Sequence, residues 1–481
     1  MLRFLVAVTI TWAAWTVWAV LGSGADVAVN VIDDVGLPVV GAEVRADGQL
    51  LGVTGDDGRV MVSWTPGQSL LEVSATGYPA LELPVLEKPA STIEAVLRAQ
   101  LLRGRILDDD GLPVEGAYVT AGNGTAVSDV EGRFTVRRAA PGPVNVWRPA
   151  WDGNTVTWEG GLGEEMITIA PQVMRAVHVG GEAARDSWQF FVDLVHETEL
   201  NALLLDLKDE SGQVFYLSEV TIAQEVRATI DFYDLGELTA DAAEEGIYLI
   251  GRIVAFQDPT AAIRAPEMAV WDTEINGPYA AGQQYFLDPT DPAAQAYALD
   301  LAVEACKAGV DEIQFDYVRF PDSRRESARF DGGVTPEVRS TTTRDFLATA
   351  VAQLHPLGCA VAADIFGFLT RAVDDGGIGQ NWETMTSVLD VASPMLYPSH
   401  YDSGWYGFDN PNDHPAELIA NALDDGLGRL SRQTVVRPWL QDFGYTPAQV
   451  RAQIDEAEKR GLGWMLWNAR SEVSVEALLG E

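Results

Sequence analysis

Two aspartates stand at the ends of apolar, strand-like runs and are the residues of this sequence best placed to do chemistry. Asp316 lies near the end of the run 312–317, and Asp364 lies near the end of the run 360–365. Two carboxyl groups that flank a glycosidic bond can cleave it, because one protonates the leaving oxygen while the other attacks the anomeric carbon or activates water. We expect Asp316 and Asp364 to form such a pair, in which Asp364 is the acid/base, with a pKa that the neighbouring carboxylate raises. In the structural alternative, Asp316 pairs with Arg319 or Arg252.

Further polar and aromatic residues stand at the ends of the other apolar runs. Arg252, Lys208 and Arg470 could donate to sugar hydroxyls or keep the carboxylates ionised, with internal ion pairing as the alternative. Aromatic side chains can stack on pyranose rings, although aromatic side chains at the ends of such runs often only pack against the rest of the protein. Asp206 and Asp442 are the alternative catalytic candidates if Asp316 or Asp364 does not have that role. The predicted substrate-binding residues are Asp206, Lys208, Arg252, Tyr317, Arg319, Tyr397, Trp439, Asp442, Trp467 and Asn468.

The segment 401–408 combines four aromatic residues with Gly404 and Gly407. Glycines interrupt regular structure, so this segment is expected to be a loop rather than part of the core. We expect the loop to face the substrate.

Motifs for other kinds of chemistry are missing from the sequence. Its five histidines are scattered, and it contains no H-E-x-x-H, C-x-x-C or EF-hand pattern, so no metal site is expected. It also contains no G-x-x-x-x-G-K loop and no G-x-S-x-G elbow, which argues against a nucleotide enzyme and a serine hydrolase. No cofactor is expected.

The elements that must position the candidate residues begin near residue 174. From there, apolar runs of strand length alternate with helical patterns, which is typical of βα units and a parallel sheet. Eight such runs predict an α/β fold, a (β/α)8 TIM barrel, with a doubly wound sheet as the alternative. In a barrel the carboxyl ends of the strands meet at one mouth, so the polar residues above would share a site. The predicted strands are 176–179, 202–207, 247–256, 312–317, 360–365, 391–396, 435–440 and 463–467, and the predicted helices include 187–199, 292–307, 343–354, 415–423 and 447–459.

Two copies of one pattern precede the barrel region. The segment 33–42 reads DDVGLPVVGA and the segment 109–117 reads DDGLPVEGA, and a Gly-Arg hairpin follows each copy. Short alternating strands between Gly, Pro and Asp turns predict two small all-β sandwich domains. Both copies resemble the carboxypeptidase regulatory-like domain, in which a G-x-P-x-x-G-A turn precedes T/S-x-x-x-G. The resemblance implies stalks or spacers without chemistry of their own.

Four segments of the barrel region carry a second resemblance: 205–212 (LDLKDESG), 286–289 (FLDP), 311–321 (DEIQFDYVRFP) and 395–398 (MLYP). With these segments, roughly residues 173 to 475 resemble a glycoside hydrolase domain family of exported bacterial proteins. Its barrels are distantly related to α-amylase-like and α-galactosidase-like hydrolases. The resemblance implies a carbohydrate substrate and a nucleophile at the end of the fourth strand, here Asp316.

The composition is strongly acidic, with 71 Asp and Glu against 32 Lys and Arg and a formal net charge of −39. Such a surface repels phosphate backbones, so nucleic acid is not expected as a partner. We interpret the acidity as a solvated surface that maintains solubility.

Residues 1–25 have the features of an export signal. Arg3 precedes an uncharged apolar run at 4–21, and small residues follow it. The run approaches the length of about 20 residues that spans a bilayer, so a cleaved signal peptide and a membrane anchor both stay open. Either one places the rest of the chain outside the cytoplasm.

The sequence contains two cysteines, Cys306 and Cys359. An oxidising compartment would permit a disulfide, but the spacing cannot show whether the two lie together. We favour buried free thiols.

The sequence thus predicts four segments: a signal peptide or membrane anchor at 1–25, sandwiches at 26–98 and 99–172, and the barrel at 173–481. We expect an extracellular or cell-surface glycoside hydrolase that acts on a polysaccharide or cell-envelope glycan. The alternative is a barrel that binds carbohydrate without cleaving it, displayed on a sandwich stalk. A metal-dependent deacetylase would need a convergent Asp/His triad, which the histidine positions do not favour.

Overall fold

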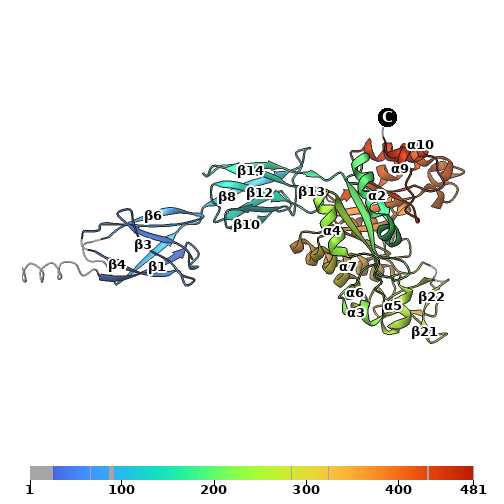
Figure 1. Cartoon of the computed structure of the whole chain (residues 1–481), viewed down its shortest axis with the longest axis horizontal. Helices are drawn as coiled ribbons and strands as arrows, with labels where there is room; N and C mark the ends of the chain where they lie inside the picture. Colours follow the sequence, from blue (N-terminus) through green and yellow to red (C-terminus); the bar gives the residue numbers. More distant parts are fainter. Residues whose placement is uncertain are drawn as a thin grey trace, which may run out of the picture. The chain divides into compact units, whose positions relative to one another are not determined.

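The structure, a computed structural model, describes residues 25–65, 67–85, 91–282, 284–322, 324–430 and 433–479. The chain divides into two units, one ending at Ala170 and the other beginning at Pro171, coloured from blue to teal and from green to red in Figure 1. The predicted signal peptide or membrane anchor at residues 1–25 lies outside the described residues, apart from Ala25. Within the described ranges, no helix has both the length and the apolar character needed to cross a bilayer.

Short strands with alternate buried residues form the N-terminal unit. They are β1 (Ala25–Asp33), β2 (Glu43–Ala46), β3 (Gln49–Val53), β4 (Arg59–Trp64), β5 (Leu70–Ala75), β6 (Tyr78–Pro84), β7 (Thr92–Leu97), β8 (Leu101–Leu107), β9 (Tyr118–Ala121), β10 (Gly124–Val127), β11 (Arg133–Arg137), β12 (Gly142–Trp147), β13 (Trp151–Asp152), β14 (Asn154–Trp158) and β15 (Glu164–Thr168). The sheets β4-β1-β7 and β3-β2-β5-β6 enclose one core, and β11-β8-β15 and β10-β9-β12-β14 repeat the arrangement. The prediction of all-β sandwiches is confirmed, while a domain boundary at residues 98 and 99 stays a prediction.

The repeated motif builds the same local structure twice. In the first copy, the Thr54 hydroxyl accepts a hydrogen bond from the Ala42 N–H and donates one to the Val39 carbonyl. In the second copy, Ser128 makes the equivalent pair of bonds, at 2.9 and 2.7 Å. Gly58, which ends the first motif, has φ 72°, and a Cβ there would lie 2.5 Å from a carbonyl oxygen. The polar and glycine positions of the motif therefore serve the turns of the sandwich.

Eight parallel strands close into a barrel in the C-terminal unit. They are β17 (Arg175–Val179), β18 (Ala202–Lys208), β19 (Tyr248–Val254), β24 (Glu312–Asp316), β26 (Ala360–Phe366), β27 (Val391–Leu396), β28 (Val435–Val436) continued by β29 (Trp439–Gln441), and β30 (Trp464–Trp467). The hydrogen-bonded order is β26-β24-β19-β18-β17-β30-β29-β27, and pairing of β26 with β27 closes the ring. Each predicted strand is present, and the seventh is interrupted before Trp439. The predicted TIM barrel is confirmed, because a doubly wound sheet would stay open.

Alternation along the barrel strands separates an apolar outer face from a partly polar inner face. In β24, Ile313 and Phe315 join the apolar cluster between the barrel and its helices. The alternate residues Glu312, Gln314 and Asp316 therefore point into the barrel. Because period-two alternation holds in the neighbouring strands as well, polar side chains from several strands meet inside the barrel.

Helices cover the outside of the barrel and supply the second half of each βα unit (Figure 1). The longer ones are α2 (Gly181–Glu197), α4 (Leu235–Glu244), α6 (Pro292–Ala308), α7 (Pro336–Leu354), α9 (Pro415–Leu427) and α10 (Pro447–Glu458). Of these, α4 is not among the helices that the sequence predicts. The shorter elements are α3 (Thr221–Glu225), α5 (Pro259–Arg264), α8 (Trp382–Thr386), α11 (Val475–Leu478) and the short strands β20 (Trp271–Asp272), β21 (Gly277–Pro278), β22 (Ala280–Ala281), β23 (Gln284–Tyr285) and β25 (Ala328–Arg329).

The two cysteines form a disulfide, so the preference for free thiols is wrong. Cys306 lies near the end of α6, and Cys359 directly precedes β26. Their Cα atoms are 6.0 Å apart, although 53 residues separate them in the chain. Packing of α6 beside the start of β26 brings them together, and this adjacency is not visible in the cysteine spacing.

Removal of this disulfide is expected to destabilise the barrel. Because the bond closes a loop of 53 residues, its loss should lower the free energy of unfolding by up to about 4 kcal/mol. The measurement is chemical denaturation of wild type and of the double variant Cys306→Ser/Cys359→Ser. Equal stability of the two proteins would show that the bond adds nothing.

Candidate active site

A cavity of about 500 Å³ opens at the carboxyl ends of the barrel strands. This volume is in the range of small-ligand sites. Its charged lining residues are Glu210, Arg252, Asp316, Arg319, Asp364 and Asp402, and its aromatic lining residues are Tyr317, Phe366, Phe368, Tyr397, Tyr401, Trp405, Trp439 and Trp467, with His400. The structure therefore brings both predicted catalytic aspartates to one cavity.

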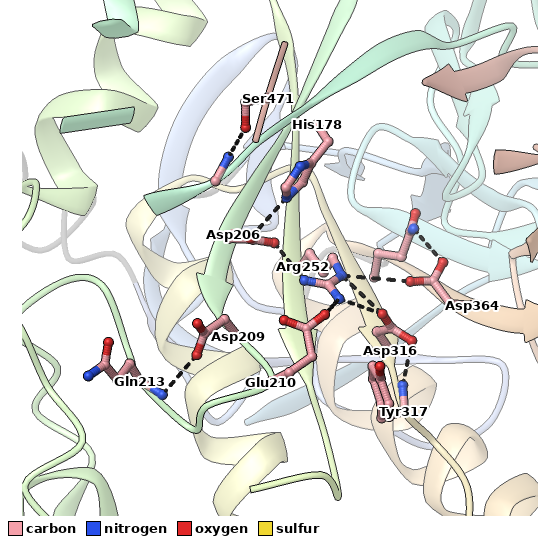
Figure 2. Close-up of polar contacts among 12 residues, drawn as sticks. His178, Asp206, Asp209, Glu210, Gln213, Arg252, Asp316, Tyr317, Asp364 and Ser471 are labelled. Carbon is pink, nitrogen blue, oxygen red and sulfur yellow. Dashed lines mark hydrogen bonds and ion pairs between the residues drawn. The ribbon is translucent and has the colours of Figure 1, made fainter. Parts of the chain in front are cut away.

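Arg252, from β19, is the electrostatic centre of this site (Figure 2). It is buried and donates to Asp206 at 2.8 Å, to Glu210 at 2.5 Å and to Asp316 at 2.5 and 3.1 Å. Its Nε also lies 4.0 Å from Oδ2 of Asp364. The structural alternative, in which Asp316 pairs with Arg252, is thus present in the fold. It does not exclude chemistry, because the pair lies at the cavity.

Asp364, from β26, is held by neutral donors. Its Oδ1 accepts hydrogen bonds from Gln314 Nε2 and Trp439 Nε1, both at 2.6 Å, while its Oδ2 lies beside Arg252. Because Oδ2 of Asp316 and Oδ2 of Asp364 lie 3.1 and 4.0 Å from the same arginine nitrogen, they are within about 7 Å of each other. This upper limit is compatible with the separation of about 5–5.5 Å at which the two carboxyl groups of a retaining enzyme flank a glycosidic bond.

Burial and charge give the two aspartates different proton affinities. Burial raises the pKa of Asp364 well above its usual value, and the neighbouring Asp316 carboxylate adds to the rise. Burial also raises the pKa of Asp316, but the charge of Arg252 opposes that rise. The pair thus favours a protonated Asp364 beside an ionised Asp316, which is the division of charge that an acid and a nucleophile need.

Asp206 supports Arg252 from the side away from the cavity. It joins Arg252 to His178, whose Nε2 lies 2.9 Å from the Asp206 carboxylate and whose Nδ1 lies 2.9 Å from the Asn468 carbonyl. Burial would raise the pKa of Asp206, but His178 and Arg252 outweigh it and lower the pKa to about 2. This aspartate is therefore a fixed anion that orients Arg252. The sequence reasoning missed His178, although its inward position on the first strand was readable from the alternation of β17.

Glu210 also lines the cavity, beside Asp316 and Asp364, and it was not among the predicted site residues. It follows β18 and accepts from the same Arg252 nitrogen as Asp316. Its side chain is 35% exposed, against 9% for Asp316 and 1% for Asp364, so it is the most accessible carboxylate of the cluster. Its position in the segment 205–212, which carries the family resemblance, could have indicated that Glu210 belongs to the site.

Several predicted substrate-binding residues are not brought to the cavity. Lys208 is buried in an ion pair with Asp258 at 2.9 Å and donates to the Val254 carbonyl, because the register of β18 shifts between Asp206 and Lys208. Asp442 accepts from the Ser474 N–H, and Asn468 donates to the Asp442 carbonyl. Arg470 is exposed and pairs with Glu472. These four residues occupy structural positions.

The predicted aromatic residues do line the cavity, but several rings also pack on charged groups. Trp467 lies over Arg252 at 5.1 Å and beside His178 at 4.2 Å, while Trp439 donates to Asp364. Tyr317 adopts φ 51°, a left-handed conformation that is uncommon for a tyrosine, and its N–H donates to Asp316. The rings therefore position the charged groups as well as forming the wall of the cavity.

The predicted substrate-facing loop reaches the cavity only in part. Tyr401 and Trp405 line it. In contrast, Tyr406 donates to Asp425, and Phe408 stacks on His414 at 4.3 Å. Tyr401 and Trp405 thus face the cavity, whereas Tyr406 and Phe408 pack on other residues.

No group of three or more His, Cys, Asp or Glu side chains is arranged to hold a metal ion in the part of the chain that the structure describes.

The profile of a family described as "Putative glycosyl hydrolase domain" matches residues 176–473. A search of curated proteins gives no significant match. Among solved structures, the chain is similar to a hypothetical protein from Ruminiclostridium thermocellum, with 32% identity over 39% of this chain and 96% of that one and a TM-score of 0.36. It is also similar to the PgaB (BpsB) glycoside hydrolase domain from Bordetella bronchiseptica, with 13% identity over 64% and 99% of the chains and a TM-score of 0.46. A third similar structure is the glycoside hydrolase domain of PelA from Pseudomonas aeruginosa, with 12% identity over 63% and 97% of the chains and a TM-score of 0.39.

Proposed function

The chain belongs to this glycosyl hydrolase domain family through its barrel, and from that premise we propose that it is an exported glycoside hydrolase of a polysaccharide or cell-envelope glycan. The observation that carries the proposal is the arrangement of Asp316 and Asp364, two carboxyl groups on one cavity that share one arginine. Their unequal surroundings favour one protonated and one ionised group, as hydrolysis of a glycosidic bond requires.

The two aspartates divide the reaction between them. Asp364 transfers its proton to the glycosidic oxygen as the bond between that oxygen and the anomeric carbon breaks. Asp316 attacks the anomeric carbon, or takes a proton from the water that does so. Arg252 keeps Asp316 ionised, and Asp206 and His178 keep Arg252 in place. Glu210 shares Arg252 with Asp316 and, being accessible, is available to bind a sugar hydroxyl.

Two features support a location outside the cytoplasm. The Cys306–Cys359 disulfide is a bond that oxidising compartments maintain. Residues 1–25 have the composition of a signal peptide or membrane anchor. We propose that the sandwiches hold the barrel away from the cell envelope as a stalk.

The direct test is digestion of a panel of polysaccharides and cell-wall glycans by the full chain, with new reducing ends as the readout. Wild type is expected to release reducing ends from at least one glycan, and the double variant Asp316→Asn/Asp364→Asn is expected to release none. The alternative, a carbohydrate-binding barrel without catalysis, predicts binding by both proteins and cleavage by neither.

The proposed mechanism predicts a bell-shaped dependence of kcat/KM on pH. Activity needs ionised Asp316, so it should rise as pH increases through the pKa of that group. It also needs protonated Asp364, so it should fall as pH increases through a pKa that burial and Asp316 hold well above the usual value. The measurement is kcat/KM for wild type and Asp364→Asn from about pH 3 to pH 9. The variant should lose the alkaline limb, and an unchanged limb would assign the acid to another group.

A further inference from the structure

Arg319 differs from the other buried cations of the barrel. Three of those cations bind carboxylates with two nitrogens or more: Arg252 binds its cluster, Arg339 binds Asp375 at 2.6 and 2.8 Å, and Arg437 binds Glu312 at 2.7 and 3.1 Å. Lys208 is paired with Asp258. Arg319 is only 4% exposed, yet no carboxylate among the described residues lies within ion-pair distance of it.

The surroundings of Arg319 are aromatic. Its guanidinium carbon lies 5.0 Å from the ring centre of Tyr317 and 5.3 Å from those of Phe286 and Phe366. Its Nη1 donates to the Phe320 carbonyl at 3.3 Å, and its Nε is buried without a hydrogen-bond partner among the described residues. Burial lowers the pKa of Arg319, and the nearby Asp322, Tyr317 and Asp316 oppose that fall without cancelling it.

Arg319 lines the same cavity as Asp316 and Asp364. A guanidinium has five N–H donors, and leaving most of them unpaired in a buried site is costly. Since the described residues supply aromatic faces and one weak acceptor, the cavity is the side from which further acceptors can come. A planar guanidinium matches a carboxylate through two parallel hydrogen bonds.

We propose that Arg319 binds a carboxylate carried by the sugar, so that the substrate is an acidic glycan. This inference rests on the proposed function and deepens it, because it names a substrate class for the same site. The carboxylate can belong to a uronic acid ring or to the lactyl ether of a muramic acid residue, and both present the same planar anion to Arg319.

The net charge of −39 opposes the approach of an acidic polymer at long range. Screening limits that repulsion to about 8 Å at physiological ionic strength, whereas a contact inside the cavity is screened much less. Binding should therefore be measured at 0.15 M salt or above, where the local contact decides the outcome.

The experiment compares acidic oligosaccharides with the same oligosaccharides after reduction of their carboxyl groups to alcohols. The probes are oligogalacturonate, oligoglucuronan and peptide-free peptidoglycan strands. Titration calorimetry uses the full chain with Asp364→Asn, because the amide imitates a protonated Asp364 and holds the glycan uncleaved. At least one acidic probe should bind about tenfold or more tightly than its reduced form. Preference for a uronate probe or for the peptidoglycan strands identifies the source of the carboxylate.

Arg319→Gln should abolish this preference, and Arg319→Lys should retain part of it. Thermal unfolding provides the matched control: Arg319→Gln should lower the Tm less than Arg339→Gln does, because the first breaks no ion pair whereas the second strands Asp375. Equal affinity for acidic and reduced probes, or a preference that survives in Arg319→Gln, would overturn the inference.

The outcomes also separate this inference from the proposed function. If wild type cleaves a neutral glycan and shows no preference for acidic probes, the proposed hydrolase function stands and the proposed role of Arg319 is wrong. If wild type prefers acidic probes but cleaves none of the probes, the carboxylate-binding role of Arg319 stands and the proposed hydrolase function is wrong.

Discussion

Replacement of Asp316 by Asn is expected to lower kcat on the glycan substrate by at least about 1000-fold. The amide cannot attack the anomeric carbon and cannot take a proton from water. The same substitution at Asp364 is expected to lower kcat by about 100- to 10,000-fold, which is the usual contribution of a positioned general acid. Both losses follow from the placement of the two side chains on one cavity.

The two roles can be separated with a substrate that needs no protonation. A nitrophenyl glycoside releases a stable phenolate, so the acid is no longer required for bond cleavage. Asp364→Asn should therefore keep most of its kcat on the aryl glycoside while losing it on the natural glycan. Asp316→Asn should lose kcat on both. Steady-state kcat for both substrates decides the assignment.

Asp442→Asn is the matched control. Asp442 also ends a barrel strand and is buried, but it accepts from Ser474 and does not line the cavity. Its kcat should stay within about threefold of wild type. If Glu210→Gln shows the large loss and Asp364→Asn does not, the accessible carboxylate is the acid, and the assignment to Asp364 is wrong.

Replacement of Arg252 by Met is expected to cause the largest loss of stability in the barrel. The substitution leaves Asp206, Glu210 and Asp316 without the cation that binds all three, and a buried ion pair that loses one partner costs about 3–5 kcal/mol. The Tm should fall by roughly 10 °C. Activity should fall as well, because Asp316 would then favour its protonated form.

The size of this loss should depend on pH in a defined direction. Burial opposes ionisation of Asp206, but His178 and Arg252 outweigh it and hold its folded pKa at about 2, below the usual value of 3.8. A carboxylate with a lowered folded pKa stabilises the protein above its unfolded pKa and loses that contribution as pH falls. The difference between wild type and Arg252→Met should therefore be greatest near neutral pH and shrink below about pH 4. Denaturant unfolding at several pH values measures it.

Arg470→Met is the control for loss of a positive charge. Arg470 is 77% exposed and pairs with Glu472 at the surface, so its loss should change stability by less than about 0.5 kcal/mol. Equal effects of the two substitutions would mean that Arg252 does not hold the carboxylates together.

The predicted architecture agreed with the structure where the evidence was local. Alternating apolar residues and turn residues define the sandwich strands, and apolar runs separated by helical patterns define the barrel. The carboxyl ends of parallel strands meet at one mouth of a barrel, so the sequence could predict that Asp316 and Asp364 lie near each other there.

The sequence-based expectations differed from the structure where the contacts of a side chain depend on a residue that is distant in the chain. A register shift in β18 turns Lys208 to Asp258 instead of the cavity. The disulfide depends on how α6 packs beside β26, which cysteine spacing does not encode.

The sequence by itself determined the strands, their inward faces and the acidic residues at their ends, because these depend on patterns within a few residues. Only the tertiary structure decided which charges become partners. Arg252 meets Asp206 and Asp316 across 46 and 64 residues of chain. Arg319 has no carboxylate of the described residues within ion-pair distance, although it is three residues from Asp316. The physical reason is that the proton affinity and the binding capacity of a buried group depend on what closure of the barrel places beside it.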